Sequence, residues 1–407
     1  MNHGLDDIVV TGMGIATARG FGLNAHWEML RDGVEPCAET DYSMKAFDAA
    51  KHLPDRRLLK AISTVDAYGL AAIASLKAGT SLGSHTFDSE RVGLYVGAPP
   101  ASAFDNEYYA DAIVAAGEGG VREFGRTSMF ARPTTLLVGL PNNVLCYGAL
   151  SLDAKGPNSN YTSSSLSAHL ALQNAVRRVK RGVLDLAVAG GFQGHTEPVN
   201  TRMFARLGLL RQAGADNAIE PFGAGSPGTI VADGAAFVSI ERRETAEKRG
   251  AHVLATYVAG AMANDARGPL MIDESGEVLE STIRRALAAA DVMPTDVGLV
   301  FACATGVPAV DRAEFMALAR IFSQIDHAPA LCSTSRVIGN LLEAGGILEL
   351  GLIGCLYDAG VVPEPMSLHG YAADSGFIRA IEPTRSYVII LRVSPWGEHS
   401  VVVARKE

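Results

Sequence analysis

The chain has 407 residues, of which 48% are hydrophobic and 19% are charged, and its net charge is −9. This length allows two domain-sized units, and the acidic balance argues against general binding to nucleic acid. The five scattered cysteines form no Cys-x-x-Cys pair, so neither a disulfide framework nor a zinc site is expected. The start of the chain lacks the basic residues of a signal peptide, and no apolar run reaches the ~20 residues of a membrane span. We therefore expect a cytoplasmic protein that has no membrane segment.

Strand and helix patterns alternate along the first half of the chain. The apolar run 8–17 predicts a buried strand that enters a glycine-rich turn, and residues 55–78 predict a long helix. Residues 91–98 predict a second strand. The segment 156–191 has the order strand, sharp turn of small residues, amphipathic helix and apolar strand. Residues 233–250 predict a strand followed by a charged helix.

The second half repeats this alternation. Strands are expected at 252–263 and 297–306, and a helix is expected between them at 276–292. Two further strands, 385–394 and 399–405, close the chain. Such alternation indicates an α/β protein built in layers.

The glycines near the start allow a nucleotide-binding interpretation. Gly12, Gly14 and Gly20 do not have the spacing of the dinucleotide-binding fingerprint, because the position of its third glycine holds Thr17. The alternative is that these glycines only form a tight turn between a strand and a helix.

Ser164 lies in the sharp turn, where a nucleophile is expected. A serine hydroxyl is a poor nucleophile unless a base removes its proton. His169 follows five residues later, about 140° around the helix, so it cannot readily reach that hydroxyl. His195, in a later loop, is the better candidate base. The alternative is that the serines of the turn only accept hydrogen bonds from the free N–H groups of the helix.

Several segments together resemble the β-ketoacyl synthases, which are thiolase-fold condensing enzymes of fatty-acid and polyketide assembly. The segments VVTGMGIATARG, GPNSNYTSSSLSAHLALQ, EPFGAGSPGTIVADG and CSTSRVIGNLLEAGGILEL match that family in order and spacing, from about Ile8 to Val403. The resemblance implies an α/β fold of five layers, α/β/α/β/α, with two pseudo-symmetric halves. We place these halves at residues 1–249 and 250–407. The resemblance implies no cofactor and no metal.

The positions that carry catalysis in that family hold other residues here. The Thr-Ala-Cys turn of the family reads Thr-Ser-Ser, so Ser164 stands at the position of the nucleophilic cysteine. Cys303 stands at the position of the first histidine. Ser335 replaces the lysine, and Asn340 replaces the second histidine. The Gly-Phe-Gly-Gly loop becomes SPWGEH, which keeps only Gly397.

Claisen condensation needs a thiolate that holds the acyl chain and two imidazoles that stabilise the developing enolate. The four replacements leave no route to this reaction. Cys303 could act as a substitute nucleophile, although no base is visible near it in the sequence. The alternative for Cys303 is an ordinary buried cysteine.

Three hypotheses follow from the resemblance. In the first, the chain is a non-catalytic chain-length factor that forms a heterodimer with an active ketosynthase and shapes its acyl tunnel. In the second, Ser164 supports acyl transfer or hydrolysis on carrier-protein thioesters. In the third, the chain is a homodimeric scaffold that binds an acyl carrier protein. Whether the chain is an enzyme therefore stays open, and an inactive subunit is the first choice.

The resemblance also suggests surfaces for partners. A dimer is expected through the strand 184–191 and the surface around 130–143. The candidates for a tunnel or interface role are Tyr109, Ile113, Phe130 and Phe204. The candidates for docking an acidic carrier protein are Arg177, Arg178, Lys180 and Arg181. These four basic residues could instead interact only with the helix dipole and solvent.

Overall fold

The structure is a computed structural model. It describes residues 4, 7–32, 41–53, 55–80, 82, 86–99, 114, 116–128, 135–211, 221–223, 226–323, 325–368, 377 and 379–407. Among these residues, no helix is long and apolar enough to cross a membrane. The cysteines that the structure describes are all free.

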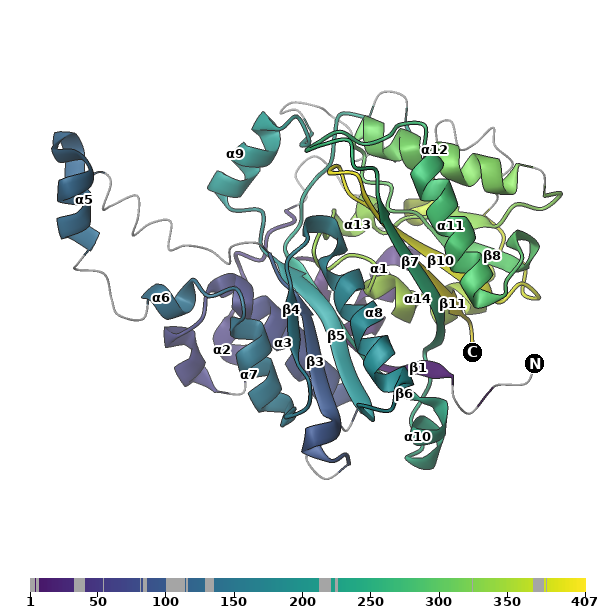
Figure 1. Cartoon of the computed structure of the whole chain (residues 1–407), viewed down its shortest axis with the longest axis horizontal. Helices are drawn as coiled ribbons and strands as arrows, with labels where there is room; N and C mark the ends of the chain where they lie inside the picture. Colours follow the sequence, from purple (N-terminus) through teal and green to yellow (C-terminus); the bar gives the residue numbers. More distant parts are fainter. Residues whose placement is uncertain are drawn as a thin grey trace.

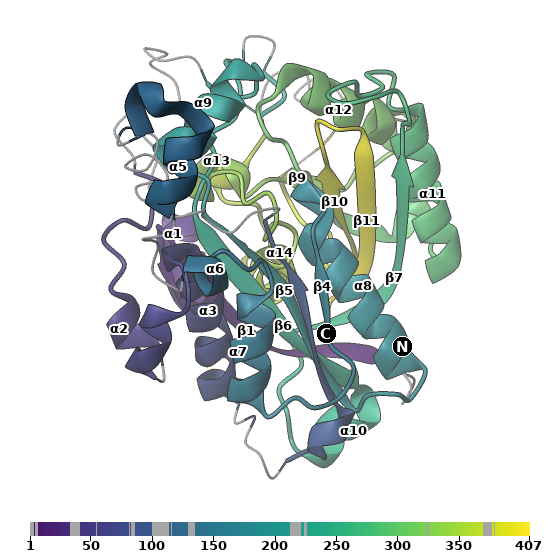
Figure 2. The same ribbon diagram turned by 60° about the vertical axis from the view of Figure 1, so that its left-hand side comes forward.

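Two halves of the chain form sheets of the same topology (Figures 1 and 2). The strands of the first half are β1 (Ile8–Thr17), β3 (Val92–Gly97), β4 (Ser159–Tyr161), β5 (Leu186–Gln193) and β6 (Gly234–Arg242). The strands of the second half are β7 (Ala255–Asn264), β8 (Val297–Phe301), β9 (Ala330–Cys332), β10 (Tyr387–Val393) and β11 (Glu398–Arg405). A short β2 (Gly20–Phe21) pairs with β1.

The strand orders show the repeat. The first half has the order β4-β3-β5-β6-β1, and the second half has the order β9-β8-β10-β11-β7. In each half the first three strands are parallel and the last two run antiparallel to their neighbours. The halves meet where Ile8–Val10 of β1 pairs with Ala255–Tyr257 of β7. The two sheets are therefore continuous through their backbone hydrogen bonds. The boundary at residue 249 stays a prediction.

Helices cover the sheets in layers (Figure 1). Helices α3 (Thr64–Thr80) and α7 (Asn143–Leu152) pack on one face of the first sheet. Helices α8 (Ser167–Lys180) and α14 (Leu348–Ala359) share a hydrophobic core with both sheets. Helices α11 (Glu277–Ala290) and α12 (Pro308–Phe322) cover the second sheet. The remaining helices are α1 (Gly22–Asp32), α2 (Ala49–His52), α5 (Gly120–Ser128), α6 (Thr135–Val138), α9 (Pro198–Arg206), α10 (Arg243–Lys248) and α13 (Ser335–Ile338).

The glycines near the start form no nucleotide-binding loop. Gly12 and Gly14 lie inside β1, so the turn that the sequence predicted at these two glycines is wrong. A Cβ on Gly14 would lie 1.9 Å from the carbonyl oxygen of Ala72 in α3. These positions therefore need glycine because helix and sheet approach closely there.

The dimer prediction for residues 184–191 is also wrong. Strand β5 pairs with β3 on one side and β6 on the other, and all of its residues are buried. It has no free edge to offer another chain. The edge of the first sheet is instead β4, whose outer side pairs with no other strand among the described residues.

Candidate functional site

The turn after β4 places two serines at the start of α8. Ser164 has a φ of +32°, which is unusual for a residue other than glycine. The Ser167 hydroxyl holds the turn, because it accepts the Ser163 N–H at 2.9 Å and donates to the Ser164 carbonyl at 3.1 Å. The Ser164 side chain does not cap the helix, and within the described chain its hydroxyl has no hydrogen-bond partner.

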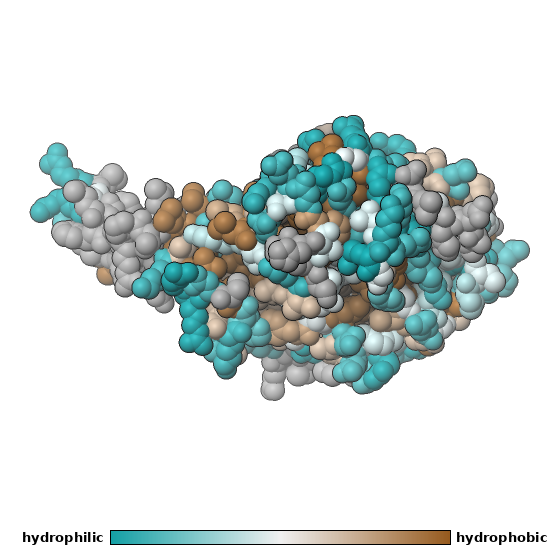
Figure 3. Space-filling view, turned by 90° about the horizontal axis from the view of Figure 1, so that it is seen from below, coloured by the Kyte–Doolittle hydropathy of each residue, from teal (hydrophilic) through white to brown (hydrophobic). Residues whose placement is uncertain are grey.

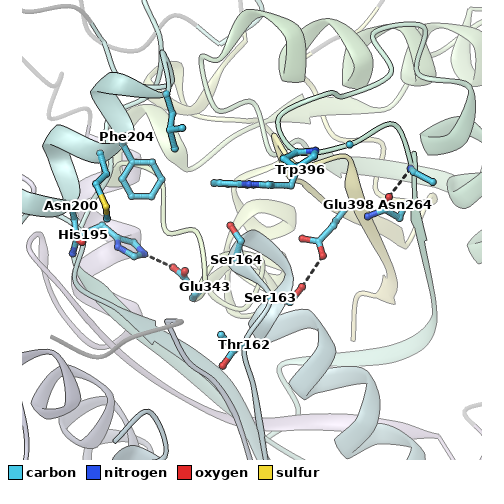
Figure 4. A pocket seen from close by; sticks show the side chains of 15 residues that line it. Thr162, Ser163, Ser164, His195, Asn200, Phe204, Asn264, Glu343, Trp396 and Glu398 are labelled. Carbon is cyan, nitrogen blue, oxygen red and sulfur yellow. Dashed lines mark hydrogen bonds and ion pairs between the residues drawn. The ribbon is translucent and has the colours of Figure 1, made fainter. Parts of the chain in front are cut away.

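These serines open onto a cavity of about 850 Å³ (Figure 4). It lies between the turn that precedes α8, helix α9 and the loop between β10 and β11. Its wall consists of Thr162, Ser163, Ser164, His195, Asn200, Met203, Phe204, Leu207, Asn264, Ala266, Gly268, Pro269, Glu343, Trp396 and Glu398. The described residues of this wall include two carboxylates and no lysine or arginine.

His195 lies in the cavity wall, but it forms its hydrogen bond with Glu343 and not with Ser164. Its Nε2 lies 2.8 Å from Oε2 of Glu343, and both side chains are buried. Burial lowers the pKa of His195, but the Glu343 carboxylate, with a smaller contribution from Asp233, raises it, and the pKa ends above its ordinary value. Figure 4 shows the Glu343 carboxylate between His195 and Ser164. His195 is therefore not placed as a base for the Ser164 hydroxyl.

The second carboxylate faces the neighbouring serine. The Ser163 hydroxyl donates a 2.9 Å hydrogen bond to Oε1 of Glu398. Glu398 and Trp396 come from the SPWGEH segment, which stands where the family has its glycine-rich loop. The replacement of that loop was visible in the sequence, but neither side chain was assigned to the site from it.

Cys303 is not available as a substitute nucleophile in this structure. Its side chain is buried, its Sγ lies 3.6 Å from the Val393 carbonyl oxygen, and it is absent from the cavity wall. Burial raises the pKa of Cys303 to about 12, so the thiolate is scarce at neutral pH. The backbone N–H groups of Cys303 and Ala304 both donate to the buried carboxylate of Glu314.

Ser335 and Asn340 are held in the protein core by hydrogen bonds. The Ser335 hydroxyl lies 2.7 Å from that of Ser333 and donates to the Ala304 carbonyl at 2.6 Å. The side-chain N–H of Asn340 donates to the Thr229 hydroxyl at 3.3 Å. Neither residue lines the cavity. The contacts of Ser335 and Asn340 are therefore those of residues that hold the fold together.

Arg392 of β10 brings a positive charge into this region. Its guanidinium donates to the Ser165 carbonyl at 3.5 Å, to Oδ1 of Asn340 at 3.4 Å and to the Leu341 carbonyl at 3.3 Å. The side chain is buried, so the charge is held by these oxygens and not by water. Sequence analysis did not identify Arg392. The signal that could have identified it is the single charged residue within the apolar run YVIILRV.

The remaining predicted residues separate into three groups. Phe204 lies in the cavity wall, where its ring packs edge-on against His195. Tyr109, Ile113 and Phe130 lie outside the described residues. The basic residues Arg177, Arg178, Lys180 and Arg181 are at the far end of α8, about 20 Å along the helix from Ser164. Their docking role stays a prediction.

A layered α/β fold with a cavity at the start of the helix after a short edge strand is the scaffold of the thiolase-fold condensing enzymes. Comparison with known proteins agrees. The model of the beta-ketoacyl synthase N-terminal domain matches residues 67–246, and that of the C-terminal domain matches residues 254–369. The chain belongs to the beta-ketoacyl synthase family.

Individual proteins are similar over nearly the whole chain. The "Putative polyketide beta-ketoacyl synthase 2" of Streptomyces coelicolor is 27% identical, across 98% of this chain and 94% of that protein. A beta-ketoacyl synthase structure from Burkholderia phymatum has a TM-score of 0.83 at 20% identity, with 98% and 99% of the two chains covered. The structure titled "The ishigamide ketosynthase/chain length factor" has a TM-score of 0.81 at 18% identity, with the same coverage. The chain therefore has the five-layered thiolase fold.

Proposed function

We propose that this chain is a non-catalytic ketosynthase-like subunit, a chain-length factor, that pairs with an active β-ketoacyl synthase and shapes its acyl tunnel. One observation carries the proposal. The four positions at which the family has cysteine, two histidines and lysine hold Ser164, Cys303, Asn340 and Ser335, and the last three do not line the cavity. A buried arginine, Arg392, is bonded to Asn340 in this region.

The names of similar proteins support a partner subunit. One similar structure is a ketosynthase with a chain length factor, and another is a type II polyketide acyl-carrier protein in complex with its ketosynthase. By this analogy, we propose an active ketosynthase and an acyl carrier protein as partners. The free edge of β4 and the exposed apolar residues Leu137, Leu140 and Leu150 in and near α6 and α7 are candidate contact surfaces. Figure 3 shows hydrophobic side chains gathered on the face seen from below.

The second candidate function, acyl transfer or hydrolysis, is supported by one contact. Of the two serines in the cavity, Ser163 has a carboxylate as partner, whereas Ser164 has neither a carboxylate nor an imidazole as partner among the described residues. A carboxylate is a weak base for a serine hydroxyl. A Ser163→Ala variant that abolishes thioester hydrolysis, while Ser164→Ala does not, would support this candidate.

The test of the proposed function is co-expression of the tagged chain with candidate ketosynthases that have intact catalytic residues, followed by size-exclusion chromatography. We expect a stable heterodimer, and we expect products only when both subunits and the carrier protein are present. Condensation by this chain alone would contradict the proposal. A homodimer that binds the carrier protein but no ketosynthase would instead support the scaffold hypothesis.

The tunnel role can be tested in the same complex. Tyr109→Ala, Ile113→Ala and Phe204→Ala should lengthen the product by at least one extension unit if these side chains limit the growing chain, because close-packed interiors leave it no other room. Met293→Ala, at an exposed position before β8 and outside the candidate contact surfaces, is the matched control. Unchanged product lengths in a folded, active complex would place the limiting residues elsewhere.

A further inference from the structure

Two buried side chains form the deep end of the cavity. Of the wall residues that the structure describes, only His195 and Glu343 are buried, at 7% and 2% exposure, and the others are at least partly exposed. A residue that lines a cavity but is shielded from solvent lies at its floor. The hydrogen bond of 2.8 Å between Nε2 of His195 and Oε2 of Glu343 joins the two side chains there (Figure 4). This bonded pair therefore sets the depth of the cavity.

The backbone of Glu343 is fixed on both sides of its side chain. Its N–H donates to Oε1 of Gln193 at 2.8 Å, and its carbonyl oxygen accepts the N–H of Ala168 at 3.0 Å. A Cβ on Gly191 would lie 2.3 Å from that carbonyl oxygen, so β5 and the segment of Glu343 are in close contact. A shift of this backbone would break both hydrogen bonds. Glu343 is therefore a rigid part of the floor.

His195 is held from the other side of the cavity floor. Its ring packs edge-on against Phe204, with 5.3 Å between the ring centroids. The next residue, Thr196, donates from its N–H and its hydroxyl to the carboxylate of Asp233, at 3.1 and 2.6 Å. The imidazole is therefore fixed both by its packing and through the backbone beside it.

The polar floor lies among apolar residues. Leu341 and Ala344, within two residues of Glu343, belong to the hydrophobic core that both sheets share. Replacing a buried ion pair by apolar residues is often neutral for stability, whereas removing only one partner is costly. Stability alone therefore does not explain why this position holds a charged pair.

Above the floor, the wall is largely apolar. Phe204 and Trp396 present rings to the cavity, and Met203 and Leu207 are 53% and 45% exposed. Concave apolar surface is typical of sites that bind the apolar part of a small molecule. An apolar chain that enters from the exposed side ends at the bonded pair, because passing it would separate two partners in a dry environment.

We propose that the bonded side chains of His195 and Glu343 limit the length of the apolar chain that this cavity accepts. The limit is set by the bulk of two side chains, one from each half of the chain. It concerns the cavity of this chain itself. It therefore holds whether or not the chain pairs with a ketosynthase and shapes that partner's tunnel.

The test measures the affinity of the purified chain for straight-chain primary alkanols from hexanol to dodecanol, each below its solubility limit. Trp396 lines the cavity, so its fluorescence reports binding, and Trp396→Phe should remove the signal. We expect the affinity to rise about fourfold with each added methylene and then to reach a plateau at one chain length. A rise that continues to dodecanol would contradict a floor at this pair.

Two double variants separate bulk from charge. His195→Ala combined with Glu343→Ala should move the plateau to longer chains. The alkanol one methylene beyond the wild-type plateau should then bind about fourfold more tightly. His195→Phe combined with Glu343→Leu keeps the bulk and removes the charges, so its plateau should match that of wild type.

A third double variant is the matched control. Glu241→Ala combined with Arg249→Ala removes another buried ion pair, outside the cavity wall, and should leave the plateau unchanged. Circular dichroism shows which variants are folded. If the first double variant does not fold, His195→Phe combined with Glu343→Ala opens one side of the floor and must still move the plateau. A plateau that stays in place when the floor is opened, or that moves as far in the bulk-conserving variant, would overturn the proposal.

Discussion

Glu343 and His195 form a buried hydrogen bond of 2.8 Å between Oε2 and Nε2, although 148 residues separate them in the chain. Glu343 lies in the segment before α14, and His195 follows β5. The bond therefore connects the two halves of the chain at the cavity wall. It also engages the histidine of the cavity wall, which is therefore not bonded to Ser164.

The stability of this pair should depend on pH. Burial lowers the pKa of His195, but Glu343 and, more weakly, Asp233 raise it, so the pKa lies above its ordinary value of 6.5. Stabilisation by the charged pair is then complete below pH 6.5 and is lost as the pH rises through the raised pKa. Urea denaturation from about pH 5.5 to about pH 9 should show a difference between wild type and Glu343→Gln that shrinks with increasing pH.

The same variant gives a direct readout. Without the carboxylate, burial dominates, and the pKa of His195 should fall below 6.5. The imidazole resonances in an NMR titration measure this value. A pKa that is equal in wild type and Glu343→Gln would show that the pair does not control the titration of His195.

The buried cysteines should resist labelling. Burial raises the pKa of Cys303 to about 12 and that of Cys332 well above its ordinary range, whereas Cys146 is exposed. Iodoacetamide at about pH 8 should therefore modify Cys146 in the folded protein and leave Cys303 and Cys332 unmodified. Mass spectrometry of tryptic peptides measures this pattern. Rapid modification of Cys303 before unfolding would revive its role as a nucleophile.

Restoring the family's catalytic residues should not restore condensation. The combined variant Ser164→Cys, Cys303→His, Ser335→Lys and Asn340→His still contains the buried guanidinium of Arg392, which is bonded to residues at the site. We expect no product from malonyl and acyl carrier protein thioesters in a radiochemical assay. Adding Arg392→Ser to this combined variant shows whether the arginine itself prevents condensation. Turnover by the first variant would show that Arg392 is compatible with the reaction.

Arg392 should contribute to stability. Its guanidinium donates to three oxygens in the protein core, and Arg392→Met would leave these acceptors without this donor. We expect the free energy of unfolding to fall by about 2 kcal/mol. Arg284→Met, at an exposed position of α11, should change it by less than about 0.5 kcal/mol. Equal effects of the two changes in urea denaturation would contradict a structural role for Arg392.

Local sequence patterns predicted much of the fold, because helices and strands have short periods. The amphipathic pattern found α8, and the apolar run after it found β5. The same patterns could not show which strand lies at an edge, since sheet order depends on pairing between distant segments. The interface role of residues 184–191 came from the family resemblance, and no local pattern could correct it.

The cavity was harder to predict than the fold. The family resemblance identified Ser164 as a site residue, and the position of His195 in the loop after β5 identified it as a candidate base. Glu343 and Glu398 were missed because their partners, His195 and Ser163, lie 148 and 235 residues away. No spacing rule connects such pairs. The glycines near the start of the chain led to a turn that the structure does not have. Close packing of α3 on β1 requires glycine, and so does a tight turn, so the sequence did not distinguish the two.

The position of β1 between β6 and β7 has a consequence for synthesis of the protein. β1 is made well before these two partners in the sheet, which begin at Gly234 and Ala255. At usual translation rates, roughly 10 to 50 s pass before both partners have been made. During this time the apolar strand has unpaired edges, which favour aggregation. Chaperone demand and expression temperature should therefore affect the yield of this protein more than substitutions on its surface.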